Sequence, residues 1–225
     1  ASDPSAIFYN PAGLTQLPGT QLNGGLHLIR IKWQFAGVGP FPGYGVKEES
    51  PGVVGTPVNL YATRRFSERL AGGIGVYNPF GLKTKWDDPD NYTGRFVNRE
   101  ASITPFYITP TLACQVNDAL SLGAGLSIIT SKIHLNREVG NSDPLYPQVP
   151  VLPGAFDLGT VDVKGNGSAV AFNLGARLKL SDDLAVGGVY RSGNDIDYKD
   201  GDADFTYTFP GTGVASVDQV LQGAF

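Results

Sequence analysis

Alternation of apolar and polar residues at every second position is the feature that most limits how this chain can fold. Residues 169–180 show it most clearly. One face carries Val170, Phe172, Leu174, Ala176, Leu178 and Leu180, and the other carries Ala169, Ala171, Asn173, Gly175, Arg177 and Lys179. Successive side chains of a strand point to opposite faces, so a period of two predicts β-structure. Helical periodicity is almost absent, and the sequence therefore predicts an all-β protein.

The same alternation recurs along the chain and predicts about seven strands. They are expected at residues 20–35, 58–63, 70–78, 101–116, 119–135, 169–180 and 184–190. In 119–135 the apolar face changes side at Ile128-Ile129. An extra residue in one strand would produce that change, so we expect a β-bulge there.

The connections between these strands differ sharply in length. Short polar turns are expected at 66–69, 116–118 and 180–183, whereas long connections are expected at 36–55, 79–100, 138–164 and after 200. Short turns at one end and long loops at the other are typical of bacterial outer-membrane β-barrels. The sequence has no apolar run of the roughly 18 residues that a membrane-spanning helix requires.

A soluble β-sandwich is the alternative, because its strands also alternate. In a sandwich the apolar faces of two sheets pack together, and the opposite faces carry charge. Here the apolar face is opposed mainly by Gly, Ala, Ser and Asn, which would suit a barrel lumen that must hold something else. The pattern favours a transmembrane antiparallel β-barrel with its apolar side chains turned toward lipid.

The strand count and the composition bound the chain further. Seven strands cannot close a bacterial barrel, and open edges in lipid are costly, so we expect the first part of a larger barrel that does not fold alone. The absence of Met also suggests an incomplete chain. A lone Cys114 excludes an internal disulfide, and a net charge of -4 argues against nucleic acid as a partner.

Four stretches together resemble the outer-membrane long-chain fatty acid and hydrocarbon transporters of the FadL/TodX type. They are residues 6–14, 76–82 with Gly94-Arg95-Phe96, 120–126 and 184–192. The resemblance implies a 14-stranded barrel, of which this chain would supply the end of an N-terminal hatch in residues 1–19 and about the first seven strands in residues 20–225. It also implies the bacterial outer membrane as location and no cofactor.

The resemblance assigns functions to particular residues. Asn10, Pro11 and Ala12 match a motif of the hatch inside the barrel, although an ordinary Asn-Pro turn is the alternative. Ile7, Phe8 and Tyr9 would then pack against the wall. The partners implied are a fatty acid or hydrocarbon ligand, membrane lipid and lipopolysaccharide, and a full-length protein of this kind is expected to be a monomer.

In this family the third strand kinks inward and leaves a lateral gate through which the ligand leaves for the bilayer. The matching residues here are Gly72, Gly73, Gly75, Asn78 and Pro79. Glycines weaken a strand and Pro79 cannot donate a ladder hydrogen bond. The glycines could instead relieve curvature or crowding inside the barrel, and both interpretations stay open.

Ligand capture is expected on the long loops, which are unusually apolar. The candidates are Phe80, Leu82, Trp86 and Phe96 in one loop and Leu145, Tyr146, Leu152 and Phe156 in another, although these residues could also pack together as a cap. Arg177 and Lys179, on the inward face, could attract a carboxylate or form internal ion pairs.

Enzymatic and metal chemistry find little support in the sequence. His27 and His134 have no Cys or carboxylate at metal-ligand spacing, and no nucleophile motif is present. The acidic run from Asp195 to Asp204 could hold calcium, but a solvated external loop is the simpler interpretation. We predict no enzyme, while an outer-membrane lipase or deacylase and a soluble binding module remain alternatives.

Overall fold

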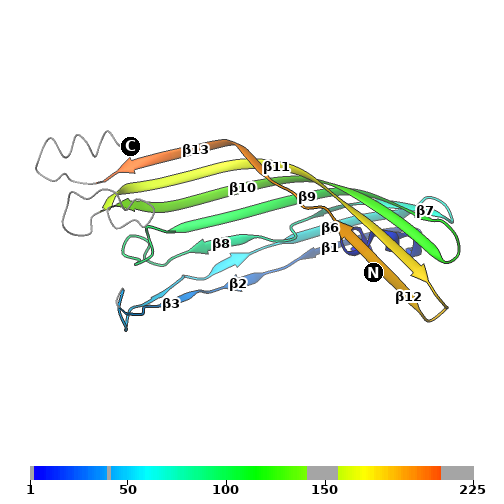
Figure 1. Ribbon diagram of the computed structural model, residues 1–225, viewed down its shortest axis with the longest axis horizontal. Helices are drawn as coiled ribbons and strands as arrows, with labels where there is room; N and C mark the ends of the chain where they lie inside the picture. Colours follow the sequence, from blue (N-terminus) through cyan, green and yellow to red (C-terminus); the bar gives the residue numbers. More distant parts are fainter. Residues whose placement is uncertain (1–2, 40–41, 141–156, 209–225) are drawn as a thin grey trace, which may run out of the picture.

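The computed structural model describes residues 3–39, 42–140 and 157–208, and its strands run lengthwise along one curved sheet (Figure 1). Two short helical elements come first, α1 (Ala6–Tyr9) and the 3-10 helix η1 (Pro11–Gln16). The strands are β1 (Thr20–Leu26), β2 (Ile29–Ile31), β3 (Gln34–Ala36), β4 (Lys47–Glu49), β5 (Val53–Gly55), β6 (Val58–Arg65), β7 (Leu70–Tyr77), β8 (Leu82–Lys85), β9 (Glu100–Gln115), β10 (Leu120–Gly140), β11 (Asp157–Lys179), β12 (Ala185–Arg191) and β13 (Asp197–Tyr207). No helix in these ranges is long and apolar enough to cross a membrane.

The sheet is a sequential antiparallel wall. Its order is β1-β6-β7-β9-β10-β11-β12, with β8 paired to β9 and β13 paired to β11. Several of the strands are segments of longer ones: β8 continues β7, β13 continues β12, and the β2–β5 and β3–β4 pairs continue the β1–β6 hairpin. The predicted wall of seven antiparallel strands is therefore confirmed.

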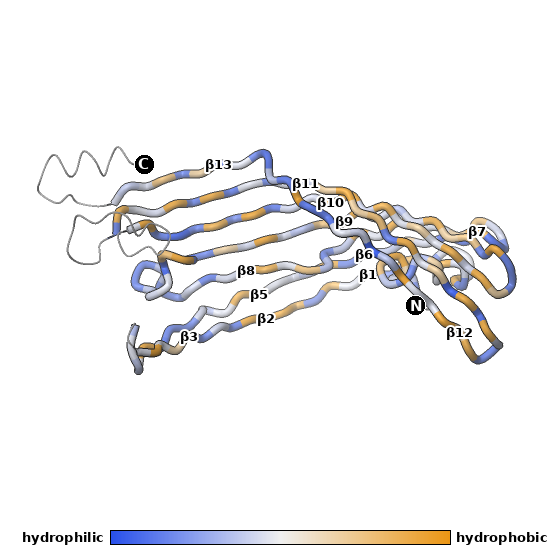
Figure 2. Tube along the Cα trace, viewed as in Figure 1, coloured by the Kyte–Doolittle hydropathy of each residue, from blue (hydrophilic) through white to orange (hydrophobic). Residues whose placement is uncertain are grey.

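The two faces of the wall are arranged as the alternation predicted. On β10 and β11 the apolar set points outward and stays exposed, with Leu126 at 50% and Val170 at 64% exposure. The opposite set, including Ser127 and Ala171, is buried on the concave side. Figure 2 shows the apolar residues gathered over the half of the sheet that ends in the short turns. We call that the turn end and the opposite one the loop end.

The expected β-bulge at Ile128-Ile129 is wrong. The β10–β11 register runs without a shift from Leu120 to Val139, and the β9–β10 register is the same on both sides of this point. The apolar face changes side because the strand leaves the apolar band. Beyond it the outward positions carry Lys132 and His134, while the inward positions carry Ile133 and Leu135.

The long connections were predicted too long. β11 begins at Asp157, so much of the expected 138–164 loop is strand, and the expected loops 36–55 and 79–100 contain β4, β5 and β8. The acidic run is also no loop, because Asp200, Asp202 and Asp204 occupy alternate positions of β13 and pair along β11. These strands extend beyond the apolar band, where the alternation that marks a lipid-facing strand is lost.

The core lies on the concave side, around the N-terminal segment. We call residues 3–17, which contain α1 and η1, the hatch segment. Its Ala6, Ile7, Ala12 and Leu14 are completely buried and pack against inward residues such as Tyr61, Tyr77 and Ile129. The elements that it touches include β6, β7, β9, β10 and β11. Tyr9, which was expected to pack on the wall, is 60% exposed.

Candidate functional site

The third strand of the wall is interrupted between β7 and β8. Tyr77 at the end of β7 pairs with Tyr107, and Leu82 at the start of β8 pairs with Ile103. Four residues, 78–81, therefore lie opposite three residues of β9, 104–106. One surplus residue on one strand is the definition of a bulge, which bends the strand and breaks the ladder locally.

Asn78 completes the hydrogen bonding on the turn-end side of this interruption. Its side-chain oxygen accepts from the Val58 N–H at 3.3 Å, and its own N–H donates to the Val58 carbonyl at 3.1 Å. Its amide nitrogen donates to the Pro105 carbonyl at 2.6 Å. On the loop-end side of Asn78, β8 pairs only with β9 within the described ranges, so no ladder joins β8 to β5. The wall is thus unbonded between its second and third strands at this point.

A cavity of about 190 Å³ adjoins the interruption on the concave side. Its lining comes from the hatch segment, from the interrupted strand and from the strands opposite, and includes Phe8, Tyr77, Pro79, Phe80, Tyr107, Asn173, Arg191 and Asn194. We call it the aromatic pocket. The ring of Tyr77 lies 5.3 Å from that of Phe8 and stacks at 5.7 Å on that of Tyr107, and Phe80 meets Tyr107 edge-on at 6.4 Å.

The polar groups of the pocket are largely occupied by protein partners. The Tyr77 hydroxyl lies 2.9 Å from the Thr109 hydroxyl, and Asn194 donates to the Tyr107 hydroxyl at 3.4 Å. Arg191 donates to the Phe8 carbonyl and lies 4.7 Å from the centre of the Phe8 ring. Ring faces and aliphatic edges make up most of the surface that remains for a guest, so this geometry suits a mainly apolar molecule.

The hatch segment forms the floor below the pocket and is fixed to the wall. The Asn10 amide donates to the Ala176 carbonyl at 3.1 Å, and its oxygen accepts from the Ala12 N–H at 3.1 Å. Glycines on the inward face leave room for this turn: a Cβ on Gly175 would lie 2.2 Å from Asn10 Oδ1, and one on Gly123 would lie 2.5 Å from the Pro11 carbonyl carbon. A larger side chain would not fit at these two inward glycines, because the backbone of the wall and the hatch segment are in contact there.

The glycines of β7 lie outside the interruption. Gly73 and Gly75 belong to the paired part of the strand and face the hatch, where added Cβ atoms would lie 3.1 and 3.0 Å from the side chain of Ile7. Gly72 faces outward. Of the five residues expected at a gate, only Asn78 and Pro79 lie at the break. A gate in this strand stays a prediction, whereas close packing explains two of the glycines.

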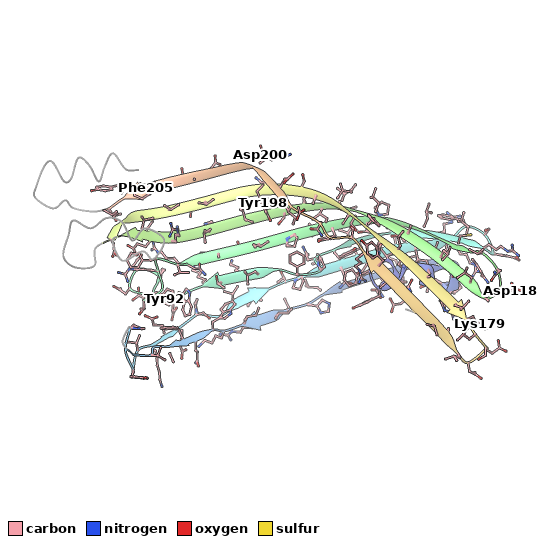
Figure 3. All side chains as sticks on the ribbon, viewed as in Figure 1. Tyr92, Asp118, Lys179, Tyr198, Asp200 and Phe205 are labelled. Atoms are coloured by element: carbon pink, nitrogen blue, oxygen red, sulfur yellow. The ribbon has the colours of Figure 1, made fainter. Side chains whose placement is uncertain are left out.

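Arg177 and Lys179 are not part of the aromatic pocket. Lys179 lies at the turn end of the wall (Figure 3) and forms an ion pair with Asp182 at 2.6 Å. Arg177 lines a separate recess beneath the hatch segment, together with Asn10 and Gly187. A carboxylate held in the aromatic pocket would contact neither Arg177 nor Lys179. Arg191 is the cation that lines this pocket.

The loop candidates are distributed over several places. Phe80 lines the aromatic pocket, Trp86 stacks on Tyr92 at 4.0 Å, and Phe96 is buried. Leu82 is exposed on β8. The other four, Leu145, Tyr146, Leu152 and Phe156, lie outside the described residues. Within the described part of the chain, no three His, Cys, Asp or Glu side chains are grouped to hold a metal ion.

A charged cluster at the loop end holds residues 95–99 on the end of β10. Arg95 forms ion pairs with Glu138 at 2.9 Å and Asp157 at 3.1 Å, and its guanidinium lies 4.5 Å from the centre of the Phe96 ring. Burial, followed by the nearby Asp157, raises the pKa of Glu138, while Arg95 and Arg99 oppose the rise. The cluster lies outside the apolar band.

We expect Arg95→Ala to loosen this cluster in a pH-dependent way. Without the guanidinium the Glu138 pKa should rise further, and the folded state would then bind a proton more tightly than the unfolded state. Stability is therefore expected to fall as pH rises from the ordinary Glu pKa through the raised one. Loss of one partner of a buried ion pair costs about 3 kcal/mol in all. Hydrogen exchange of residues 94–99 at pH 5 and pH 8 measures it. Adding Glu138→Gln should remove the pH dependence, and its persistence would contradict the explanation.

The alternation itself contains a signal for an aromatic surface on the inward face. Tyr61, Tyr77 and Tyr107 all occupy inward positions of neighbouring strands, among small residues. Large aromatic side chains on a lumen face suggest a binding surface. Asn194 had no such signal, because it lies in the irregular segment between β12 and β13.

Comparisons with known proteins place these features in context. The family model described as "Outer membrane protein transport protein (OMPP1/FadL/TodX)" matches residues 1–223. An outer membrane protein of Neisseria meningitidis is 36% identical over 92 residues, which are 39% of this chain and 20% of that protein. A crystal structure of a Pseudomonas aeruginosa FadL homologue is similar with a TM-score of 0.65 and 22% identity, covering 85% of this chain and 47% of that one.

The Pseudomonas putida toluene transporter TodX is similar with a TM-score of 0.64 and 16% identity, over 85% of this chain and 51% of that chain. This chain thus spans about half the length of these solved structures.

Proposed function

The chain belongs to the outer membrane protein transport family (OMPP1/FadL/TodX), and from that premise we propose that it takes part in the uptake of hydrophobic compounds across the outer membrane. Members of this family are transporters. The ligand class we propose is long-chain fatty acids or hydrocarbons. Residues 1–19 would act as the end of a hatch and residues 20–225 as the first part of the barrel wall.

The observation that carries this proposal is the position of the aromatic pocket. It lies between a floor that is fixed to the wall and an interruption in that wall. Thr15 strengthens the floor, because its hydroxyl lies 3.0 Å from that of Ser121 on β10. A guest in the pocket therefore meets fewer obstacles toward the interruption of the wall than toward the hatch segment. Lateral release into lipid also suits an oily molecule, which gains nothing from an aqueous exit.

The pocket would act as a way station between capture and release. Exposed apolar residues at the loop end would take up the ligand, and Phe80 would receive it at the break in the third strand. Phe80 is suited to this task because it is 53% exposed and still contacts Tyr107. Arg191 could orient a carboxylate, but the aromatic lining supplies most of the contact area.

Replacing Phe80 with alanine tests the pocket. We expect roughly tenfold weaker binding of a fatty acid or monoaromatic hydrocarbon, since a lost aromatic contact costs about 1–2 kcal/mol. Fluorescence titration of the whole purified protein with a fatty-acid probe measures the affinity. Tyr190→Ala is the matched control, because Tyr190 is an aromatic residue of the outward face that is 60% exposed. Equal affinity of Phe80→Ala and wild type would place the binding site elsewhere.

A further inference from the structure

The outer surface of the wall has a recess that neither the hatch nor the pocket explains. It lies at the turn end of β6, β7 and β9, has a volume of about 390 Å³, and is lined by Ala62, Arg64, Phe66, Gly72, Ile74 and Leu112 among others. Its floor is at Gly72, where an added Cβ would lie 2.8 Å from Leu112 Cδ2 and 2.9 Å from Phe66 Cε2. Because glycine has no side chain, Gly72 leaves a groove in a surface that is otherwise covered by apolar side chains.

Arg64 is the one charged residue of this lining, and it faces outward. Within the described part of the chain, its guanidinium has no hydrogen-bond or ion-pair partner. The adjacent Arg65 differs, because it donates to the carbonyls of Ser67 and Glu68 in the turn. At the edge of the hydrocarbon layer the long side chain of an arginine can reach the headgroup region, where an anion can pair with it. Its planar fork fits a phosphate.

A second recess on the same surface shows what is special about the first. It lies over β9, β10 and β11, has a similar volume of about 410 Å³, and is lined by Leu112, Leu122, Ala124 and Leu174 among others. No charged side chain lines it. The two grooves are therefore similar in size, and of the two only the first has a charged side chain in its lining.

We propose that the recess at Gly72 is a binding site for an anionic glycerophospholipid of the inner leaflet. The phosphate binds Arg64, and one acyl chain lies in the groove along Ile74 and Leu112. Short turns of such barrels face the periplasm, where phospholipid headgroups lie, so the arginine is at the right depth.

The acyl chain would lead to the interruption of the third strand. From Gly72 to Asn78 the strand rises six residues, about 20 Å at 3.3 Å per residue. At a tilt of about 40° this is roughly 15 Å of depth, or half the hydrocarbon layer. The tail of a lipid held by Arg64 therefore ends at the break between β7 and β8. Such a lipid would provide the first hydrocarbon that a released ligand meets, but its binding does not require that the protein transports anything.

Native mass spectrometry of the whole detergent-solubilised protein tests this site with dioleoyl phosphatidylglycerol as the probe. We expect one tightly retained lipid in the wild type and retention about tenfold weaker in Arg64→Gln. Retention should also be weaker in Ala62→Phe, which fills the groove but keeps the arginine. Arg69→Gln, in the neighbouring turn, and Ala124→Phe, which fills the uncharged recess, should bind as wild type does. Heat-modifiable gel migration shows that each variant is folded, and the two lining variants are independent of each other.

Three outcomes would overturn the proposal. Equal retention by Arg64→Gln and wild type would show that the arginine binds no headgroup. Equal retention of a neutral diacylglycerol would show that the tails alone bind. Displacement of the phospholipid by oleate at equal concentration would assign the groove to a fatty acid. Ligand uptake is measured separately, so a failure of transport and a failure of lipid binding are distinguished.

Discussion

Replacing Gly175 with valine is expected to dislodge the hatch segment from the barrel wall. Even the Cβ of the new side chain would lie 2.2 Å from Asn10 Oδ1 and 2.7 Å from Pro11 Cδ. Neither atom can move away freely, because the Asn10 amide is bonded to Ala176 on the same strand. The contacts that hold Ile7 and Leu14 in the core would be lost together. Each buried side chain contributes about 1.5–3 kcal/mol, so the hatch would lose roughly 3–6 kcal/mol of packing.

The result should appear as an opened lumen. The single-channel conductance of the whole protein in planar bilayers is expected to rise well above that of wild type, and cells that carry the variant should become sensitive to large hydrophilic antibiotics. Gly188→Val is the matched control, since a Cβ at this outward glycine of the neighbouring strand meets nothing within 4 Å. A closed, low-conductance Gly175→Val protein would contradict the role of the glycine.

Deleting Pro79 is expected to close the interruption of the third strand. The deletion leaves three residues opposite the three of β9, so β7 and β8 can pair with β9 in one register. Lys83 and Lys85 keep their outward positions, because removing one residue brings β8 into the register of β7. The bulge would disappear without turning β8 over.

A continuous third strand should slow uptake while leaving the barrel intact. About three new ladder hydrogen bonds, at about 1 kcal/mol each, would have to open for a ligand to leave sideways. That cost of about 3 kcal/mol corresponds to a roughly hundredfold slower passage. Uptake of a radiolabelled fatty acid or toluene in cells is the measurement. Pro79→Ala retains the surplus residue and should transport nearly as wild type does, whereas unchanged uptake after the deletion would exclude lateral release between the third strand and β9.

Much of the wall could be predicted from sequence because each strand carries its own signal. The outward set of residues 169–180 and of residues 120–128 is where the alternation placed it. The signal failed where the environment changed. Above the apolar band the outward face meets water, and the exchange of polar and apolar positions at Ile128-Ile129 reflects that boundary. It was mistaken for a bulge because a change of solvent and a shift of register leave the same pattern in one strand.

The candidate site was predicted only in part, for a different reason. The aromatic pocket combines Phe8, Tyr77, Phe80, Tyr107 and Arg191, which come from the hatch and from separate strands. Asn78 and Pro79 could be suspected from their chemistry, because Pro79 cannot donate a ladder hydrogen bond and the Asn78 side chain can satisfy the backbone groups that are left. The surplus residue could not be counted before the pairing partners on β9 were known.

The sequence alone determined that this protein is a wall of antiparallel strands and which of its faces meets lipid, because a period of two is a local property that every residue pair expresses. The tertiary structure decided where that wall is interrupted and which inward glycines carry the hatch. Asn10 and Ala176 are 166 positions apart, and only the curvature of the sheet brings them together. Contacts of that kind depend on the register and bend of many strands at once, which no single stretch of sequence encodes.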